Sequence, residues 1–172
     1  MLITAHGAAA ALATAIYAKA TKQENLCTAK NLGKMFFLGI LPDVPLTALA
    51  LSGHFDPAIH YHHRWITHTP IFWLAASGLV ALFFSRKAGF ELLSATWLHL
   101  AMDWYGGADG IAFLSPFTTQ QFGAGLHGVN GPAGFRIYLS NPLFLSLEIA
   151  VQGTFLALGA FWLVKKFIHR QL

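Results

Sequence analysis

The chain has 172 residues, of which 55% are hydrophobic and only 10% carry a charged side chain. Soluble domains contain about 25% charged residues, so this composition excludes an ordinary water-soluble protein and indicates a membrane protein. The formal net charge of +4 arises from short basic clusters beside apolar segments, a pattern of membrane topology signals rather than of a nucleic-acid-binding face.

Hydrophobic runs predict five helical segments separated by polar or glycine-rich loops. In chain order they cover residues 2–18, 34–51, 70–84, 90–105 and 143–164. Only the last reaches the length of about 20 residues that a straight membrane crossing requires. Pro42 and Pro45 are expected to interrupt the second segment. We therefore predict an all-α fold, a polytopic membrane bundle of about five helices, as a single domain over residues 1–172.

The stretch from Gly106 to Pro142 is rich in glycine and proline, with phenylalanines between them. This composition predicts a long loop. A loop of that length in a small domain is either functional, such as an ordered lid, or a loosely packed connector.

The basic residues predict an orientation in the membrane. If all five segments cross, nine Lys and Arg residues fall on one side and only Arg64 and Arg136 on the other. The positive-inside rule puts the group of nine in the cytoplasm. The same topology brings a set of polar residues to the non-cytoplasmic face: His6, His63, His68, His99, Asp103 and Glu148.

His99 and Asp103 lie four residues apart in the fourth segment. Their side chains therefore project from one helix face, where they can bind one cation together. The alternative is a hydrogen-bonded pair that stabilises the helix end. A carboxylate inside an apolar segment is costly without a partner, which favours the functional interpretation.

The segment from His62 to Thr69 places His63 and His68 beside Arg64. Imidazole nitrogen is a good ligand for Zn, Mn or Fe, and arginine binds phosphate or carboxylate in a bidentate manner. This combination favours a metal-bound anionic substrate. The alternative is a polar loop whose histidines cap helices. Because Cys27 is the only cysteine, a cysteine-rich metal site is excluded.

Asp43 lies between Pro42 and Pro45 within an apolar run. It is a candidate metal ligand or general base, and the alternative is an N-cap of the second half of a broken helix. His6 and Glu148 are candidates only because the topology places them near the other polar residues.

The order of these motifs resembles the YdjM-like family of inner-membrane-associated metal-dependent hydrolases, which is linked to the LexA-controlled damage (SOS) response of bacteria. The resemblance covers about residues 1–120 and rests on five elements in order: His6, Leu41–Pro45, His63–Thr69, the His99 and Asp103 pair, and Gly110–Phe117. It implies hydrolysis at the bacterial inner membrane. A more distant similarity to zinc-dependent phospholipase C suggests a phosphoester substrate.

We therefore expect a membrane-bound hydrolase with its site on the non-cytoplasmic side, acting on a phospholipid, a lipid-linked phosphate or a small ester. One or two divalent cations are expected, zinc first, with manganese or iron as alternatives. Asp43 and Arg64 are the predicted catalytic residues, and the predicted metal ligands are His6, Asp43, His63, His68, His99 and Asp103. The rival functions are a non-enzymatic metal-binding or transport protein and a haem protein; the paired hard carboxylates argue against haem.

Overall fold

The computed structural model describes residues 2–54, 62–106, 110–124 and 131–168. Within these ranges the regular structure is helical, apart from an isolated antiparallel bridge between Ile111 and Phe122. The predicted all-α fold class is therefore confirmed. The α-helices are α1 (Ile3–Ala20), α2 (Ala29–Ile40), α3 (Val44–Leu51), α5 (Pro70–Phe83), α6 (Arg86–Gly106), α7 (Gly131–Ser140) and α8 (Pro142–Ile168). The short 3-10 helices are η1 (Glu24–Cys27), η2 (Leu41–Asp43), η3 (His62–Arg64) and η4 (Ile66–His68).

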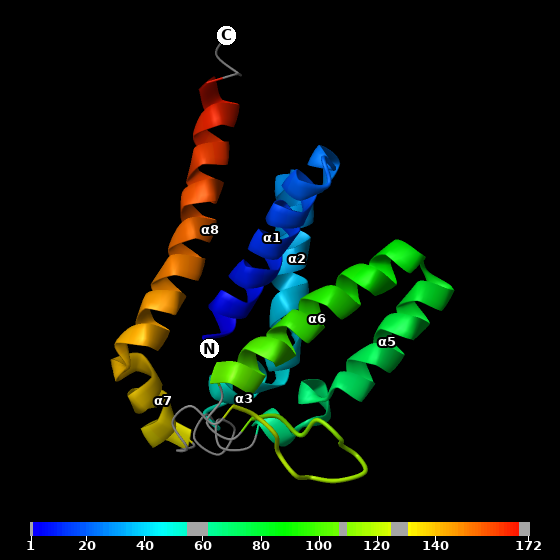
Figure 1. Ribbon diagram of the computed structural model, residues 1–172, viewed down its shortest axis with the longest axis vertical. Helices are drawn as coiled ribbons and strands as arrows, with labels where there is room; N and C mark the ends of the chain where they lie inside the picture. Colours follow the sequence, from blue (N-terminus) through cyan, green and yellow to red (C-terminus); the bar gives the residue numbers. More distant parts are fainter. Residues whose placement is uncertain (1, 55–61, 107–109, 125–130, 169–172) are drawn as a thin grey trace.

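Helices α1 and α2 approach closely because small residues line their contact (Figure 1). A Cβ atom added to Gly7 would lie 2.8 Å from the carbonyl oxygen of Phe36, and one added to Gly39 would lie 2.8 Å from that of His6. Small residues at such crossings let two backbones come together, as is common in membrane helices. This crossing brings His6 and Gly39 to one level of the bundle.

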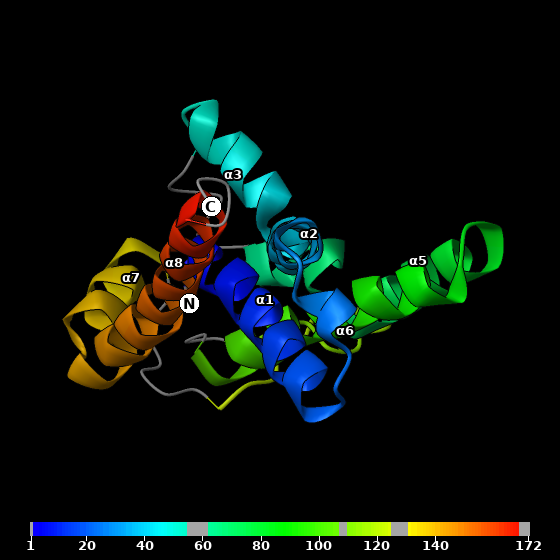
Figure 2. The same ribbon diagram turned by 90° about the horizontal axis from the view of Figure 1, so that it is seen from above.

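The second predicted segment is broken where its prolines suggested. Helix α2 ends at Ile40, the turn η2 follows with Pro42 as its second residue, and α3 starts at Val44. Seen from above, α3 extends away from α2, which is viewed end-on (Figure 2). The predicted interruption is confirmed, and it leaves Asp43 buried at the corner.

Helices α5 and α6 form an antiparallel hairpin (Figure 1). Close approach is again set by a glycine, since a Cβ atom on Gly89 would lie 2.6 Å from the carbonyl oxygen of Ser77. Helix α6 has 21 residues and starts earlier than the predicted residue 90. The C-terminal end of α6 lies near the start of α1 (Figure 1).

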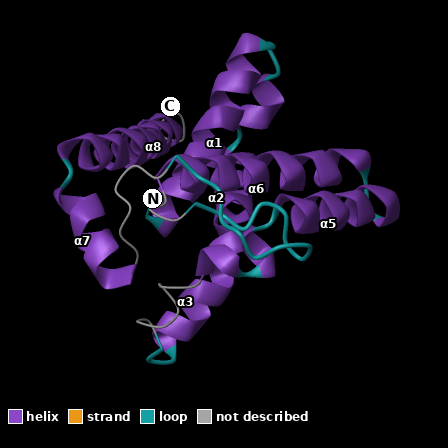
Figure 3. Cartoon of the chain, turned by 60° about the horizontal axis from the view of Figure 1, so that its bottom comes forward, coloured by secondary structure: helices purple, strands orange, loops and turns teal. Residues whose placement is uncertain are grey.

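The predicted loop from 106 to 142 contains a helix that the prediction missed. Helix α7 spans Gly131–Ser140, although its composition includes Gly131, Pro132 and Gly134. Pro132 is its second residue, where the missing N–H breaks no helical hydrogen bond. The part of the loop at residues 110–124 lies at the end of the bundle where α6 ends and α5 begins (Figure 3). There the Ala112 N–H donates to the His63 carbonyl oxygen at 3.1 Å.

Two segments of the described chain are long and apolar enough to cross a membrane, Ala29–Leu51 and Pro142–Val164. The second has a strongly exposed apolar surface, on which Leu156 and Phe161 are each 68% exposed. Large apolar surfaces of this kind mark contact with a membrane or with another protein. The number of full crossings remains a prediction.

Candidate metal centre

The loop between residues 62 and 69 carries two of the predicted ligands and is held rigidly. The Trp73 indole N–H donates to the Thr67 carbonyl oxygen at 2.7 Å, and the Thr69 hydroxyl donates to the carbonyl oxygen of Ile66 at 2.8 Å. As a result His63 and His68, which lie in η3 and η4, are both buried over the end of the bundle.

His99 and Asp103 share one face of α6, as their spacing predicted, with the His99 Nε2 atom 3.0 Å from Asp103 Oδ2. The other ring nitrogen, Nδ1, lies 2.7 Å from the carbonyl oxygen of Gly39 on α2. A carbonyl oxygen only accepts, so Nδ1 of His99 carries a proton and the Nε2 atom faces the carboxylates. A backbone partner on the outer nitrogen is the usual support of a metal-ligating histidine.

His6 joins the group from the first turn of α1. Its ring stacks on that of His99 with 3.8 Å between the ring centroids, and its Nε2 atom lies 3.1 Å from Asp103 Oδ1. The close crossing of α1 and α2 at Gly7 and Gly39 places His6 at this depth. These contacts bring His6 together with His99 and Asp103, while the membrane topology from which their proximity was expected stays a prediction.

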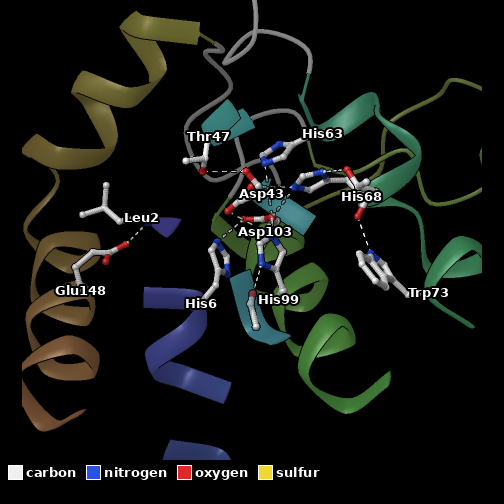
Figure 4. A network of polar contacts seen from close by, with 12 residues as sticks. Leu2, His6, Asp43, Thr47, His63, His68, Trp73, His99, Asp103 and Glu148 are labelled. Atoms are coloured by element: carbon white, nitrogen blue, oxygen red, sulfur yellow. Dashed lines mark hydrogen bonds and ion pairs between the residues drawn. The ribbon is translucent and has the colours of Figure 1, made fainter. Parts of the chain in front are cut away.

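Asp43 enters the same group from the broken corner between α2 and α3 (Figure 4). Its Oδ1 atom lies 3.3 Å from His68 Nε2, and its Oδ2 atom lies 3.7 Å from His99 Nε2. On the opposite carboxylate, Asp103 Oδ2 lies 3.6 Å from His68 Nε2 and 3.7 Å from His63 Nε2. Each carboxylate therefore faces several imidazoles at once.

The six predicted metal ligands are brought together, and all are buried: His6, Asp43, His63, His68, His99 and Asp103. Subsets of this group lie with their ligand atoms within 4.8 Å of one another. Within the described ranges the Nε2 atoms of His6, His68 and His99 face carboxylate oxygens at 3.0–3.3 Å, but none of these contacts has the geometry of a hydrogen bond. Buried polar atoms are normally paired. A divalent cation would satisfy all three nitrogens, and the set of imidazoles and carboxylates has the donor chemistry that Zn, Mn or Fe prefers.

Two histidines of the loop, His62 and His68, are held in the protonation state that a metal ligand needs. Burial lowers the pKa of His68, and it lowers the pKa of His62 to about 3, with His63 and His68 contributing to the second effect. Neutral imidazole is the ligating form, because a metal and a proton compete for the same lone pair. These side chains are thus neutral at ordinary pH.

Two candidates lie beside the cluster rather than in it. The Arg64 side chain is exposed at the rim, and its Nε–H donates to Gln121 Oε1 at 2.7 Å. Glu148 is buried, but its hydrogen bonds join it to the start of α1, to α7 and to the next turn of α8 rather than to the cluster. It accepts from the Leu2 N–H at 2.7 Å, from Gln152 Nε2 at 2.8 Å and from the hydroxyl of Tyr138.

The prediction left His62 out of the ligand set, yet its ring lies 4.0 Å from that of His63 between centroids. His62, His63 and His68 form a further group whose ligand atoms lie within 4.8 Å of one another. The adjacent pair of histidines in the sequence was the available signal. No feature of the sequence predicted the hydrogen bond between His99 and the Gly39 carbonyl oxygen.

Comparison with protein families gives a match over nearly the whole chain. Residues 1–171 match the family described as YdjM inner membrane protein. Comparisons with curated proteins and with solved structures found no significant match, and the more distant similarity to zinc-dependent phospholipase C remains a prediction. The match extends beyond the motifs of the first 120 residues into the last helix, so the chain belongs to the YdjM inner membrane protein family.

Proposed function

We propose that this protein is a membrane-bound metal-dependent hydrolase that cleaves a phosphoester or ester. The observation that carries the proposal is the convergence of four buried imidazoles, from His6, His63, His68 and His99, on two buried carboxylates, from Asp43 and Asp103. Such a group is costly to bury in an apolar protein without a counterion. A divalent cation held there, most readily zinc, would act as a Lewis acid and would lower the pKa of a bound water to about 7.

The residues around the cluster divide the remaining tasks. Asp43 lies at the corner between α2 and α3, within reach of both His68 and His99. It serves either as a metal ligand or as the general base that accepts a proton from the attacking water. Asp103, in contact with His6 and His99, holds the imidazoles in place.

Arg64 is the proposed binding group for the anionic oxygens of the substrate. It follows His63 directly and is exposed at the rim of the cluster, so its guanidinium can meet a substrate arriving from outside. A planar, always charged guanidinium suits phosphate and stabilises charge that develops in the transition state. A fixed cation beside the ligands also disfavours the rival function, a path for metal ions.

A lipid headgroup or a lipid-linked phosphate is the proposed substrate class. The cluster lies at one end of the helices, where α1 starts and α6 ends (Figure 1), and family membership places the protein in an inner membrane. The nine-to-two distribution of basic residues assigns this end to the non-cytoplasmic side. A site at this end of a membrane-spanning bundle would lie near the phosphate groups of the lipids.

The test uses detergent-purified protein loaded with Zn²⁺, Mn²⁺ or Fe²⁺ and incubated with phospholipids, lipid-linked phosphates and simple aryl esters. We expect metal-dependent hydrolysis that is lost in His99→Ala and retained in His54→Ala, since the His54 side chain is exposed and its Nδ1 atom lies 3.2 Å from the hydroxyl of nearby Ser52. Circular dichroism checks that both variants fold. Metal-replete protein that cleaves none of these compounds, but carries metal ions across proteoliposomes, would overturn the proposal in favour of transport.

A further inference from the structure

The metal centre contains more donors than one cation uses. Seven side chains contribute: the six predicted ligands and His62. A zinc ion in a protein is bound by about four ligands, and an octahedral ion by about six. The donors fall into two sets that adjoin each other: His6 and His99 lie with Asp43, and His62, His63 and His68 lie together on the loop. His68 and His99, with Asp103, lie where the two sets meet.

The rings of the loop group surround a common point. The ring centroid of His62 lies 4.0 Å from that of His63 and 5.3 Å from that of His68, and the His63 and His68 centroids are 5.3 Å apart. One nitrogen of each ring lies within 4.8 Å of the others. Ligands of a tetrahedral ion with bonds of about 2.0–2.1 Å are about 3.4 Å apart. Small side-chain rotations therefore suffice to close the group on an ion.

Both carboxylates lie between the two groups. Asp43 presents Oδ1 to His68 at 3.3 Å and Oδ2 to His99 at 3.7 Å. Asp103 presents Oδ1 to His6 at 3.1 Å, and its Oδ2 lies between the two groups, 3.0 Å from His99, 3.6 Å from His68 and 3.7 Å from His63. A carboxylate with one oxygen toward each group is suited to bridging two cations, which two-metal hydrolases hold about 3.5–4 Å apart.

We propose that the centre holds two divalent cations: one between His6 and His99, the other in the loop group with His62 as a ligand, and Asp43 and Asp103 bridging them. This inference deepens the proposed function and rests on it. A second cation would add a clamp on the leaving oxygen of a phosphoester, in addition to activation of the attacking water. It therefore narrows the substrate class from esters in general to phosphoesters.

The test counts ions and detects their proximity. Wild-type protein, His62→Ala, His62→Gln, His99→Ala and the control His54→Ala are loaded with Mn²⁺, desalted and measured by elemental mass spectrometry and electron paramagnetic resonance. We expect two ions with a spin-coupled signal in the wild type and in His54→Ala. In both His62 variants we expect the ratio to fall to one and the signal to become that of an isolated Mn²⁺. His62→Gln guards against a folding defect of the alanine variant.

Three other results would overturn the inference. A wild type that saturates at a single ion, lost in His99→Ala but kept in both His62 variants, would remove the second site and leave the proposed function standing. Retention of two coupled ions without His62 would remove His62 from the ligand set. A wild type that binds no ion would overturn the proposed function as well.

Discussion

The Nδ1–H of His99 donates to the carbonyl oxygen of Gly39 at 2.7 Å, across the contact between α6 and α2. With Nδ1 held there, the Nε2 atom of His99 faces the two carboxylates, 3.0 Å from Asp103 Oδ2 and 3.7 Å from Asp43 Oδ2. Gly39 also lies where α1 and α2 cross so closely that an added Cβ atom would be 2.8 Å from the His6 carbonyl oxygen. The packing of three helices thus determines the orientation of one imidazole.

Gly39→Ala should therefore impair both folding and metal binding. Its methyl group would lie 2.8 Å from the His6 carbonyl oxygen and from the Ala10 Cβ atom, which forces α1 and α2 apart and moves the carbonyl away from His99. The matched control is Gly33→Ala on the same helix, where an added Cβ meets nothing within 4 Å. It should be neutral or stabilising by up to about 1 kcal/mol. Thermal unfolding in detergent and metal content measure both; equal behaviour of the two variants would contradict the prediction.

Removal of metal should destabilise the protein. Without a cation the buried carboxylates and imidazoles of the proposed centre lose the ligand that stabilises their arrangement. A ligand that binds only the native state raises its stability with the logarithm of the ligand concentration relative to Kd. Chelation should lower the melting temperature, and addition of Zn²⁺ should restore it. His99→Ala serves as the control, since its melting temperature should respond much less to either treatment. A wild-type melting temperature that ignores chelator argues against a bound metal.

Arg64→Ala should reduce kcat/KM by about tenfold or more while leaving metal content unchanged, because it removes a charge-assisted contact of about 1.5–3 kcal/mol to the substrate. Since the Arg64 side chain also bonds to Gln121, the control is Gln121→Ala, which tests whether that bond alone matters. We expect a much smaller loss for Gln121→Ala. If both variants lost kcat/KM to the same extent in steady-state kinetics, Arg64 would have a structural role in the loop and would not bind the substrate.

Tyr138→Phe should lower the free energy of unfolding by about 1–3 kcal/mol, because the buried Glu148 loses one of its donors. Tyr138→Phe combined with Glu148→Gln should cost less than the sum of the single variants, as expected for two residues in contact. Metal content should not change in either variant. Additive losses in denaturant unfolding would show that the two side chains act independently.

The same pair predicts a pH dependence. Burial and the hydrogen bond to Glu148 raise the pKa of the Tyr138 hydroxyl above its ordinary value, which is about 10. A folded pKa above the unfolded pKa gives a stabilising contribution that is complete below pH of about 10 and declines as the pH rises further. The stability difference between wild type and Tyr138→Phe should therefore shrink above that pH. A difference that stays constant up to pH 12 would contradict this assignment.

Local features of the sequence determined the helices and part of the site. Hydrophobic runs predicted the helical segments, Pro42 and Pro45 predicted the break that places Asp43, and the spacing of His99 and Asp103 predicted a shared helix face. These inferences succeeded because they depend on the period of the helix and on the missing N–H of proline, which act over a few residues.

Only the tertiary structure decided which partners these residues have. Glu148 pairs with Leu2, 146 residues away, and His99 with Gly39, 60 residues away. The burial of Tyr138 against Glu148 accompanies a helix, α7, in a stretch whose glycines and proline predicted a loop. His62 lies beside His63 and His68 because the loop folds over the end of the bundle. Such contacts leave no periodic pattern, because they are set by how closely the helices pack. Where α1 meets α2 and where α5 meets α6, the limit is a glycine that leaves no room for a Cβ atom.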